Sequence, residues 1–458
     1  MARAIESKWS VEQSAVRLKR LHYVLKRLYE TLTSRITAEP IYELKTGFSY
    51  HAYLFAEYVT AIRQRVGEMR EPPLGLEKVP HKSLQLLMDE VIASPTTEEL
   101  ILGVYSVVLP AILEASARLQ NEAHPLADAP TVRLAKLIQF ELKEVLDFGS
   151  QAIQCLVTSE FQGSSKTWLE LLKNCLVSAG GLDGSQVSDE SLPLQPIYSI
   201  QPYRYQGEPK RDERFQDSYN AGVNPEAFLY DERFTARDKT LMMYYKRIRE
   251  IDVPEMMASI LYELREDEPW EFHKEMSRQL WDEARHAMMG EVGFASLGID
   301  WSMIPINFTW SRNLNLQLDA RERHGVLFFI EQGLMPKTGK RYEWEVGIAS
   351  GEGLSGLFQD FDWADEVLHA QIGRRWYVPR YRSLNEALAY GDRCWTKVVS
   401  QWQAYCDQGL TSHRNWWPEL YQTACARWNV QPDPVALAFH QTYEDSRADL
   451  QKLGPSNS

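Results

Sequence analysis

Two stretches of the chain carry carboxylate and imidazole side chains at the same spacing. Residues 281–290 read W-D-E-A-R-H-A-M-M-G, and residues 363–373 read W-A-D-E-V-L-H-A-Q-I-G. Side chains three residues apart lie on one face of a helix, so each stretch can present an oxygen and a nitrogen to one point. The pairs are Glu283 with His286, and Glu366 with His369. We interpret the two stretches as halves of one dinuclear metal site.

A carboxylate site of this kind in a four-helix bundle needs one further glutamate from each of two other helices. Glu283 lies thirteen residues beyond Trp270, where a turn is expected. That distance is about 20 Å along a helix at 1.5 Å per residue. Glu255 lies fourteen residues before Pro269 and is the predicted partner. Glu263 is the alternative, but it would lie about 10 Å closer to the turn than Glu283 does.

The second hairpin predicts Glu331 by the same reasoning. Glu366 lies about fifteen residues after the glycine-marked turn near residues 347–353, and Glu331 lies about sixteen before it. Residues 326–330 are all apolar, so an unpaired Glu331 would carry a heavy burial cost unless it binds a metal. The count assumes a helix that continues through Pro336, which is its weak point.

Each motif glutamate is preceded by an aspartate. Asp282 and Asp365 stand four residues before His286 and His369. An aspartate so placed can accept the outer ring N–H of a metal-bound imidazole, which fixes its tautomer and raises its basicity. Whether each aspartate serves the histidine of its own helix or of the facing helix is left open. We interpret Arg285 as an ion-pair partner for a nearby carboxylate.

The simpler alternative is that these residues form solvated, salt-bridging helix faces. Against it, His286 and His369 are the only two of ten histidines with Glu three and Asp four residues before them. Six positions therefore agree on a metal site. Tyr262, seven residues after Glu255, is a candidate for radical or proton transfer, but we favour a core tyrosine with a satisfied hydroxyl.

The motifs D-E-A-R-H-A and D-E-V-L-H-A-Q-I-G, preceded by V-P-E-M-M-A and F-F-I-E-Q-G-L, resemble the ferritin-like di-iron carboxylate superfamily, most closely an uncharacterised bacterial ferritin-like family. The resemblance covers about residues 235–380. It implies two iron ions, although the same ligands suit manganese or a mixed pair. The implied ligands are Glu255, Glu283, His286, Glu331, Glu366 and His369.

The resemblance also implies a function, which spacing alone does not supply. We expect a non-haem di-iron oxidoreductase that activates dioxygen to oxygenate or oxidise a small organic substrate, whose identity the fold does not specify. The alternatives are metal handling, such as a ferroxidase, and a non-catalytic scaffold with a structural metal site. A fainter likeness at residues 49–58, S-Y-H-A-Y-L-F-A-E-Y, suggests a ferritin-like N-terminal bundle, expected to bind no metal because it lacks an ExxH pair.

Composition limits the partners. The formal net charge of -13 argues against a nucleic-acid partner. The five cysteines form no CxxC pair, and neither a signal peptide nor an apolar run of about eighteen residues is recognised, which predicts a cytoplasmic protein without a membrane partner. We expect a monomer or homodimer whose partners are dioxygen and a small molecule.

Helical periodicity without a strand pattern predicts an all-α protein of two four-helix, ferritin-like bundles, the second with additional C-terminal helices. We divide the chain into an N-terminal bundle (1–160), a helix with a Tyr- and Pro-rich connecting arm (161–234), the metal bundle (235–380) and C-terminal helices packed on it (381–458). A continuous helix is expected from about residue 237 to the turn at 268–270. The last helix is expected at 434–453.

Overall fold

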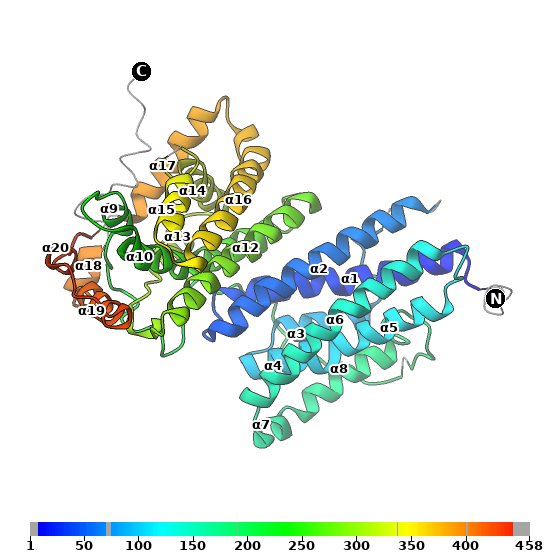
Figure 1. The fold of residues 1–458 in the computed structure, drawn as a ribbon. Coiled ribbons are helices and arrows are strands. Elements are labelled where there is room, and N and C mark those ends of the chain that lie inside the picture. Colours follow the sequence, from blue (N-terminus) through cyan, green and yellow to red (C-terminus); the bar gives the residue numbers. More distant parts are fainter. Residues whose placement is uncertain (1–7, 70–74, 190, 337, 400–401, 443–458) are drawn as a thin grey trace. The chain divides into compact units, whose positions relative to one another are not determined.

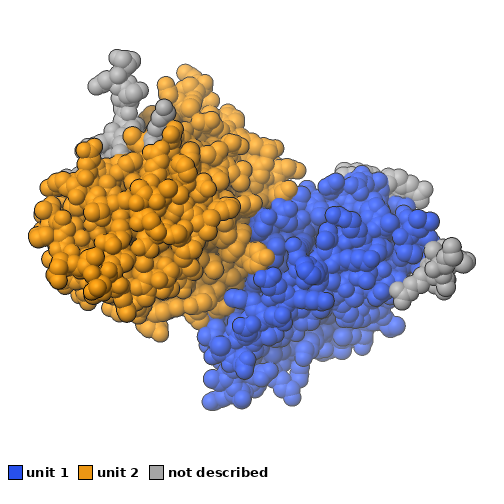
Figure 2. Space-filling view, in the orientation of Figure 1, with its two compact units in different colours: residues 1–33, 51–205 blue, residues 34–50, 206–458 orange. Residues whose placement is uncertain are grey.

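The computed structural model describes residues 8–69, 75–189, 191–336, 338–399 and 402–442 (Figure 1). These ranges form helices and connecting segments and contain no strand, which confirms the all-α class. The chain divides into two compact units, residues 1–33 with 51–205 and residues 34–50 with 206–458 (Figure 2). The second unit therefore includes a short N-terminal segment, and the predicted 161–234 range is shared between the units.

Helical periodicity predicts N-terminal helices at about residues 11–33, 41–69, 82–92, 97–121, 130–158 and 165–179, and the observed helices agree to within a few residues. They are α1 (Val11–Ile36), α2 (Tyr42–Glu68), α3 (Lys82–Ile92), α4 (Thr97–Ile101), η2 (Leu102–Val108), α5 (Leu109–Glu122), α6 (Ala129–Leu156), α7 (Ser159–Ser164) and α8 (Lys166–Ser178). The sequence places Pro110 inside the helix expected at about residues 97–121, where proline predicts a kink, and the structure has the π-helical segment η2 just before it. Proline lacks an N–H and its ring crowds the preceding turn, which favours such a local change of hydrogen bonding.

The continuous helical stretch Thr97–Glu122 is long and apolar enough to cross a membrane by length and composition, with a mean hydropathy of 1.9 in its most apolar window. No apolar run of about eighteen residues is recognised here from the sequence, because a few polar residues interrupt it. Within the protein, 72% of that window is buried, and η2 packs against α6 and α8. This burial is typical of the central helix of a bundle.

The second unit carries the motif helices. Its elements are α9 (Pro225–Leu229), α10 (Ala236–Arg249), α11 (Asp252–Glu263), α12 (Trp270–Ser296), η3 (Trp301–Met303), α13 (Thr309–Gln317), α14 (Ala320–Gly333), α15 (Lys340–Ala349), α16 (Gly353–Trp376), η4 (Val378–Arg380), α17 (Leu384–Val399), α18 (Trp402–Asp407), α19 (Trp417–Trp428) and α20 (Pro434–Leu437). The helix predicted to end at residue 453 thus ends at Leu437, and its part beyond residue 442 lies outside the described residues.

Two helices that were predicted to be continuous are interrupted. The helix before the turn at 268–270 breaks at Glu250 and Ile251 into α10 and α11. The helix containing Glu331 ends at Gly333, ahead of Pro336, and α15 follows as a separate element. Both breaks change which residues of these segments lie opposite Glu283 and Glu366 on the motif helices.

Close packing of α10 on α12 depends on two glycines of α12. A Cβ atom at Gly290 would lie 2.3 Å from the backbone nitrogen of Ile248, and one at Gly293 would lie 2.5 Å from the ring of Tyr244. Ordinary contacts are longer than 3.4 Å, so a larger residue at either position would push the helices apart. The C-terminal end of α10 is thereby brought against the first motif helix.

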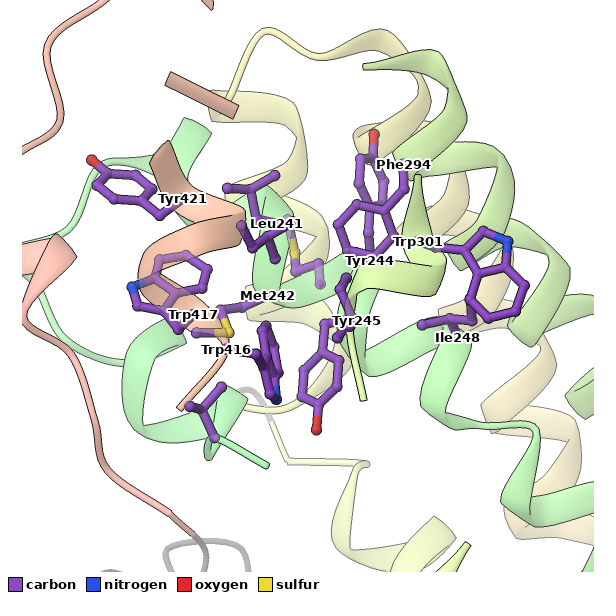
Figure 3. Close-up of a cluster of buried hydrophobic side chains, with 14 of the residues drawn as sticks. Leu241, Met242, Tyr244, Tyr245, Ile248, Phe294, Trp301, Trp416, Trp417 and Tyr421 are labelled. Atoms are coloured by element: carbon purple, nitrogen blue, oxygen red, sulfur yellow. The ribbon is translucent and has the colours of Figure 1, made fainter. Parts of the chain in front are cut away.

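A buried aromatic cluster holds the other face of α10 (Figure 3). Tyr245 packs edge-on against Trp416 with ring centroids 4.5 Å apart, and Trp417 stacks on Tyr421 at 5.2 Å. These C-terminal aromatic side chains are almost fully buried. Helix α10 is therefore held between α12 and α19, which fixes the position of its last residues.

The connecting arm, residues 182–224, has no helix among its described residues. Within the first unit, the carboxylate of Glu90 accepts hydrogen bonds from the backbone N–H groups of Ile197, Tyr198 and Ser199. Within the second unit, Arg211 donates to the carbonyl oxygens of Ile306 and Asn307. Both ends of the arm are thus fastened to the unit to which they belong.

Candidate metal centre

Two groups of acidic and imidazole side chains in the second unit could each hold a metal ion. The ligand atoms of each group lie within 4.8 Å of one another. The first group is Glu283, Glu331, Glu366 and His369, and the second is Glu250, His286 and Asp362. Five of the six predicted ligands are therefore brought together, whereas Glu255 belongs to neither group.

The two imidazoles present their Nδ1 atoms to these groups. His369 Nδ1 lies 3.1 Å from Glu283 Oε1 and 3.5 Å from Glu366 Oε2. His286 Nδ1 lies 3.4 Å from Glu250 Oε2 and 3.6 Å from Glu283 Oε2. The two oxygens of Glu283 thus face different histidines, which places this carboxylate between the two groups.

The Nε2 atoms of the two histidines show which aspartate bonds to which histidine. His286 Nε2 lies 3.3 Å from Asp365 Oδ2, and His369 Nε2 lies 3.4 Å from Asp282 Oδ2. Each aspartate therefore serves the histidine of the facing helix. Because an ionised carboxylate only accepts hydrogen bonds, Nε2 carries the proton and Nδ1 can offer its lone pair to a metal. Arg285 bonds to both aspartates, as its predicted ion-pair role requires.

Six inward-facing atoms lack a hydrogen-bond partner among the described residues. They are Glu250 Oε2, Glu283 Oε1, His286 Nδ1, Glu331 Oε2, Glu366 Oε2 and His369 Nδ1. A single buried polar atom without a partner costs about 1 to 3 kcal/mol, and such atoms are rare in native proteins. Six converging on one place are relieved by cations, and carboxylates with imidazoles are suitable ligands for iron or manganese. The residues therefore fit a dinuclear metal centre.

The titration behaviour of the first group reflects like charges held together. Burial raises the pKa of Glu331 well above its usual range, and the neighbouring carboxylates Glu366 and Glu283 raise it further. Burial would also raise the pKa of Glu366, but Lys340, Glu331 and His369 together hold that pKa well below its usual range. Burial lowers the pKa of His286, yet the neighbouring carboxylates of Asp365, Glu250 and Glu283 raise it to about 10. A metal ion that binds here must displace protons.

The predicted ligand Glu255 has a different role. Its carboxylate pairs with Lys45, accepts from Arg211 Nε at 3.1 Å, and accepts from Ser311 Oγ at 2.6 Å. Burial would raise the pKa of Glu255, but Arg211 and Lys45 lower it to about 2. This carboxylate is committed to a buried ion-pair network and has no atom left for a metal.

The error lies in where the helix ends. The prediction counted from Pro269, but α11 ends at Glu263 and residues 264–269 form the turn. Glu283 is thirteen residues after the first residue of α12 (283 − 270), and thirteen residues before the end of α11 is position 250 (263 − 13). Counting from the real helix ends therefore leads to Glu250, just before the first residue of α11, in the break between α10 and α11.

The sequence contains local signals for two of the residues that the prediction missed, Glu250 and Asp362, but none for Lys340. Pro254 lies in the first turn of α11, where proline is tolerated, and inside a continuous helix it would cost about 3 kcal/mol. It therefore marked a new helix start close after Glu250. Asp362 stands one turn before Glu366, on the same helix face. Nothing in the sequence distinguishes the fully buried Lys340 from a surface lysine.

Glu331 joins the centre although the count that selected it was invalid, because α14 ends two residues beyond it. The burial argument from residues 326–330 holds, since Glu331 is itself only 4% exposed. Tyr262 is nearly buried at 8% exposure, and Arg265 lies over its ring at 4.3 Å. It does not line the cavity described next, which favours the core tyrosine interpretation.

A cavity of about 310 Å³ adjoins the first group. Carboxylates of both groups form part of its wall, through Glu250, Glu283, Glu331 and Glu366. Apolar residues form much of the remainder: Val253, Met256, Trp310, Leu314, Leu327, Phe329, Ile330, Leu334 and Trp395. This volume is at the small end of the range of small-molecule sites, and the mixture of apolar wall and a few converging polar groups is typical of them.

No family profile, curated protein or solved structure matches this chain. The ligand groups therefore rest on the chain's own geometry, and the ferritin-like likeness of the two motifs stays a prediction.

Proposed function

We propose that the protein is a non-haem di-iron oxidoreductase that activates dioxygen to oxygenate or oxidise a small, largely apolar organic molecule. We further propose that α10, α12, α14 and α16 form a ferritin-like four-helix bundle around the metal pair. The observation that carries the proposal is that the cavity and the ligand groups share a wall. A substrate in the cavity would lie directly against the carboxylates.

Each side chain has a defined task in this proposal. Bound iron would supply the redox chemistry with dioxygen. Glu283, between the two groups, would bridge the metal positions, and Asp282 and Asp365 would hold the imidazoles in the required tautomer. The apolar wall would orient the substrate and exclude water from the reacting atoms.

The cavity also separates this function from metal handling. The walls of this cavity include the aromatic residues Trp310, Phe329 and Trp395, together with the charged residues Glu226, Lys246, Arg249 and Asp252. The aromatic part of the wall suits an organic molecule better than hydrated iron. A partly apolar cavity beside the ligand groups is what an enzyme with a small organic substrate requires.

Dioxygen uptake by the anaerobically Fe(II)-loaded protein tests the proposal. We expect uptake limited to about one turnover per centre, which resumes only when a reductant or substrate is supplied. The matched control is Glu283→Gln, which should lose uptake together with metal. Continued uptake with every addition of Fe(II), accompanied by ferric mineral, would identify a ferroxidase. Full loading without any uptake would identify a structural metal site.

A further inference from the structure

The two ligand groups differ in the cations that already lie beside them. Lys340, at the first position of α15, is fully buried, and its Nζ lies 2.9 Å from Asp362 Oδ2 and 3.0 Å from Asp362 Oδ1. Arg247 also pairs with Asp362, and its guanidinium lies 2.9 Å from Glu250 Oε1. Both carboxylates of the second group are thus paired with cations of the protein itself.

The first group has much less internal compensation. Lys340 reaches only Glu366 Oε1, at 2.9 Å, and leaves Glu366 Oε2 facing His369. Glu331 receives a neutral amide hydrogen bond from Gln279 at 3.2 Å. The four atoms of this group without a hydrogen-bond partner are Glu283 Oε1, Glu331 Oε2, Glu366 Oε2 and His369 Nδ1.

The difference follows from corresponding positions of the two motif helices. Asp362 stands four residues before the motif glutamate of α16, and Gln279 stands four residues before that of α12. One helix therefore offers a carboxylate where the other offers an amide. This extra carboxylate is Asp362, and Lys340 donates hydrogen bonds to both of its oxygens.

The net charge of the two ligand groups limits how many divalent ions they can bind. The two groups contain five carboxylates, and Arg247 with Lys340 returns two positive charges, which leaves −3 with neutral imidazoles (−5 + 2). One divalent ion reduces this to −1, and a second would make the centre positive. A second metal must therefore compete for Asp362 with the ammonium of Lys340, and with the guanidinium of Arg247 that stays beside it.

We propose that Lys340 is an internal counter-cation of the second group, so that the centre binds one divalent metal tightly in the first group and a second only when the ammonium leaves Asp362. The inference rests on the proposed function for the existence of a metal centre, but it does not depend on dioxygen chemistry. Metal content at the second position is then set by α15, an element that provides no ligand of its own.

Anaerobic titration of the metal-free protein with Mn(II), followed by calorimetry and elemental analysis, tests the inference. We expect the wild type to show one tight and one weaker equivalent. Lys340→Met should tighten the weaker equivalent by roughly tenfold or more, within the usual 5- to 150-fold range of coupling between sites. Lys340→Arg keeps the charge and should keep two separate phases. The control Lys239→Met removes a buried lysine that bonds to the hydroxyl of Tyr342 and should change neither phase.

The outcomes separate the inference from the proposed function. Two equally tight equivalents in the wild type, or an unchanged second phase in Lys340→Met, would overturn the inference and leave the metal centre intact. Absence of any metal binding by the wild type would overturn both. If Lys340→Met fails to fold, Asp362→Asn carries the test. It should abolish the weaker phase and spare the tight one, and any other pattern would refute the assignment.

Discussion

Replacing Glu255 by glutamine distinguishes a structural carboxylate from a metal ligand. In the folded protein Glu255 is fully buried and pairs with Lys45 and Arg211. Removing one partner of a buried ion pair typically costs about 3 to 5 kcal/mol, because the remaining charge is left without compensation. Arg211 would keep the carboxylate of Asp252, whereas Lys45 would be left with neutral acceptors, such as the carbonyl oxygen of Lys210 at 3.0 Å. We therefore expect Glu255→Gln to lose about 3 kcal/mol, the lower end of that range.

The same interaction has a pH dependence. Against the effect of burial, Arg211 and Lys45 lower the pKa of Glu255 from 4.5 to about 2. A depressed carboxyl pKa stabilises the protein above its unfolded value of 4.5, and this stability is lost as the pH falls through 2. The wild type should therefore lose stability between about pH 4.5 and 2 more steeply than Glu255→Gln.

Denaturant unfolding of the metal-free proteins, followed by tryptophan fluorescence, measures the loss, and elemental analysis measures bound metal. Glu255→Gln should be destabilised and still bind metal in its folded form. The matched variant Glu250→Gln should weaken metal binding, which Glu255→Gln should not, and should also lose stability because Arg247 loses a paired carboxylate. If Glu255→Gln lost its metal at unchanged stability, the reasoning from helix ends would be wrong.

Three further predictions concern the helices and the metal. Gly290→Ala should cost about 1 to 3 kcal/mol and lower the melting temperature by several degrees, because its Cβ would lie 2.3 Å from a backbone nitrogen; Gly353→Ala, with nothing within 4 Å, should melt like the wild type. Equal melting of the two variants would contradict the close approach of α10 to α12. Asp282→Asn should weaken metal binding about 10- to 100-fold in a chelator competition, since it removes the partner of His369 Nε2; unchanged affinity would refute that role. Chelation should lower the melting temperature of the metal-loaded protein, by an amount equivalent to about 2.7 kcal/mol when the metal had been at 100 times its Kd, and identical melting before and after chelation would show that no metal binds the native state.

The parts of the centre that sequence could predict are local. Glu283 with His286, and Glu366 with His369, are brought together by helix periodicity alone, because three residues span less than one turn. Glu331 could be predicted from the burial of its apolar neighbours. In each case the information lies within a few residues of the ligand.

The parts that failed depend on where one helix ends and how the next packs on it. Glu250 faces α12 because α11 stops at Glu263 and a six-residue turn follows, which moves every position before the turn relative to every position after it. At 1.5 Å per residue, a five-residue error is about 7.5 Å, enough to exchange a metal ligand for an ion-pair partner. Lys340 is buried by the tertiary packing of α15, which has no local signature.

The crossed pairing of Asp282 with His369, and of Asp365 with His286, has a consequence for protein engineering. A ten-residue motif copied from one of these helices into a new scaffold would carry its glutamate and histidine but would leave behind the aspartate that orients that histidine. The smallest portable part of this centre is therefore the pair α12 and α16 at their native spacing. A designer who grafts both helices together transfers the two histidines with the aspartates that orient them, whereas a designer who grafts one transfers only a helix face.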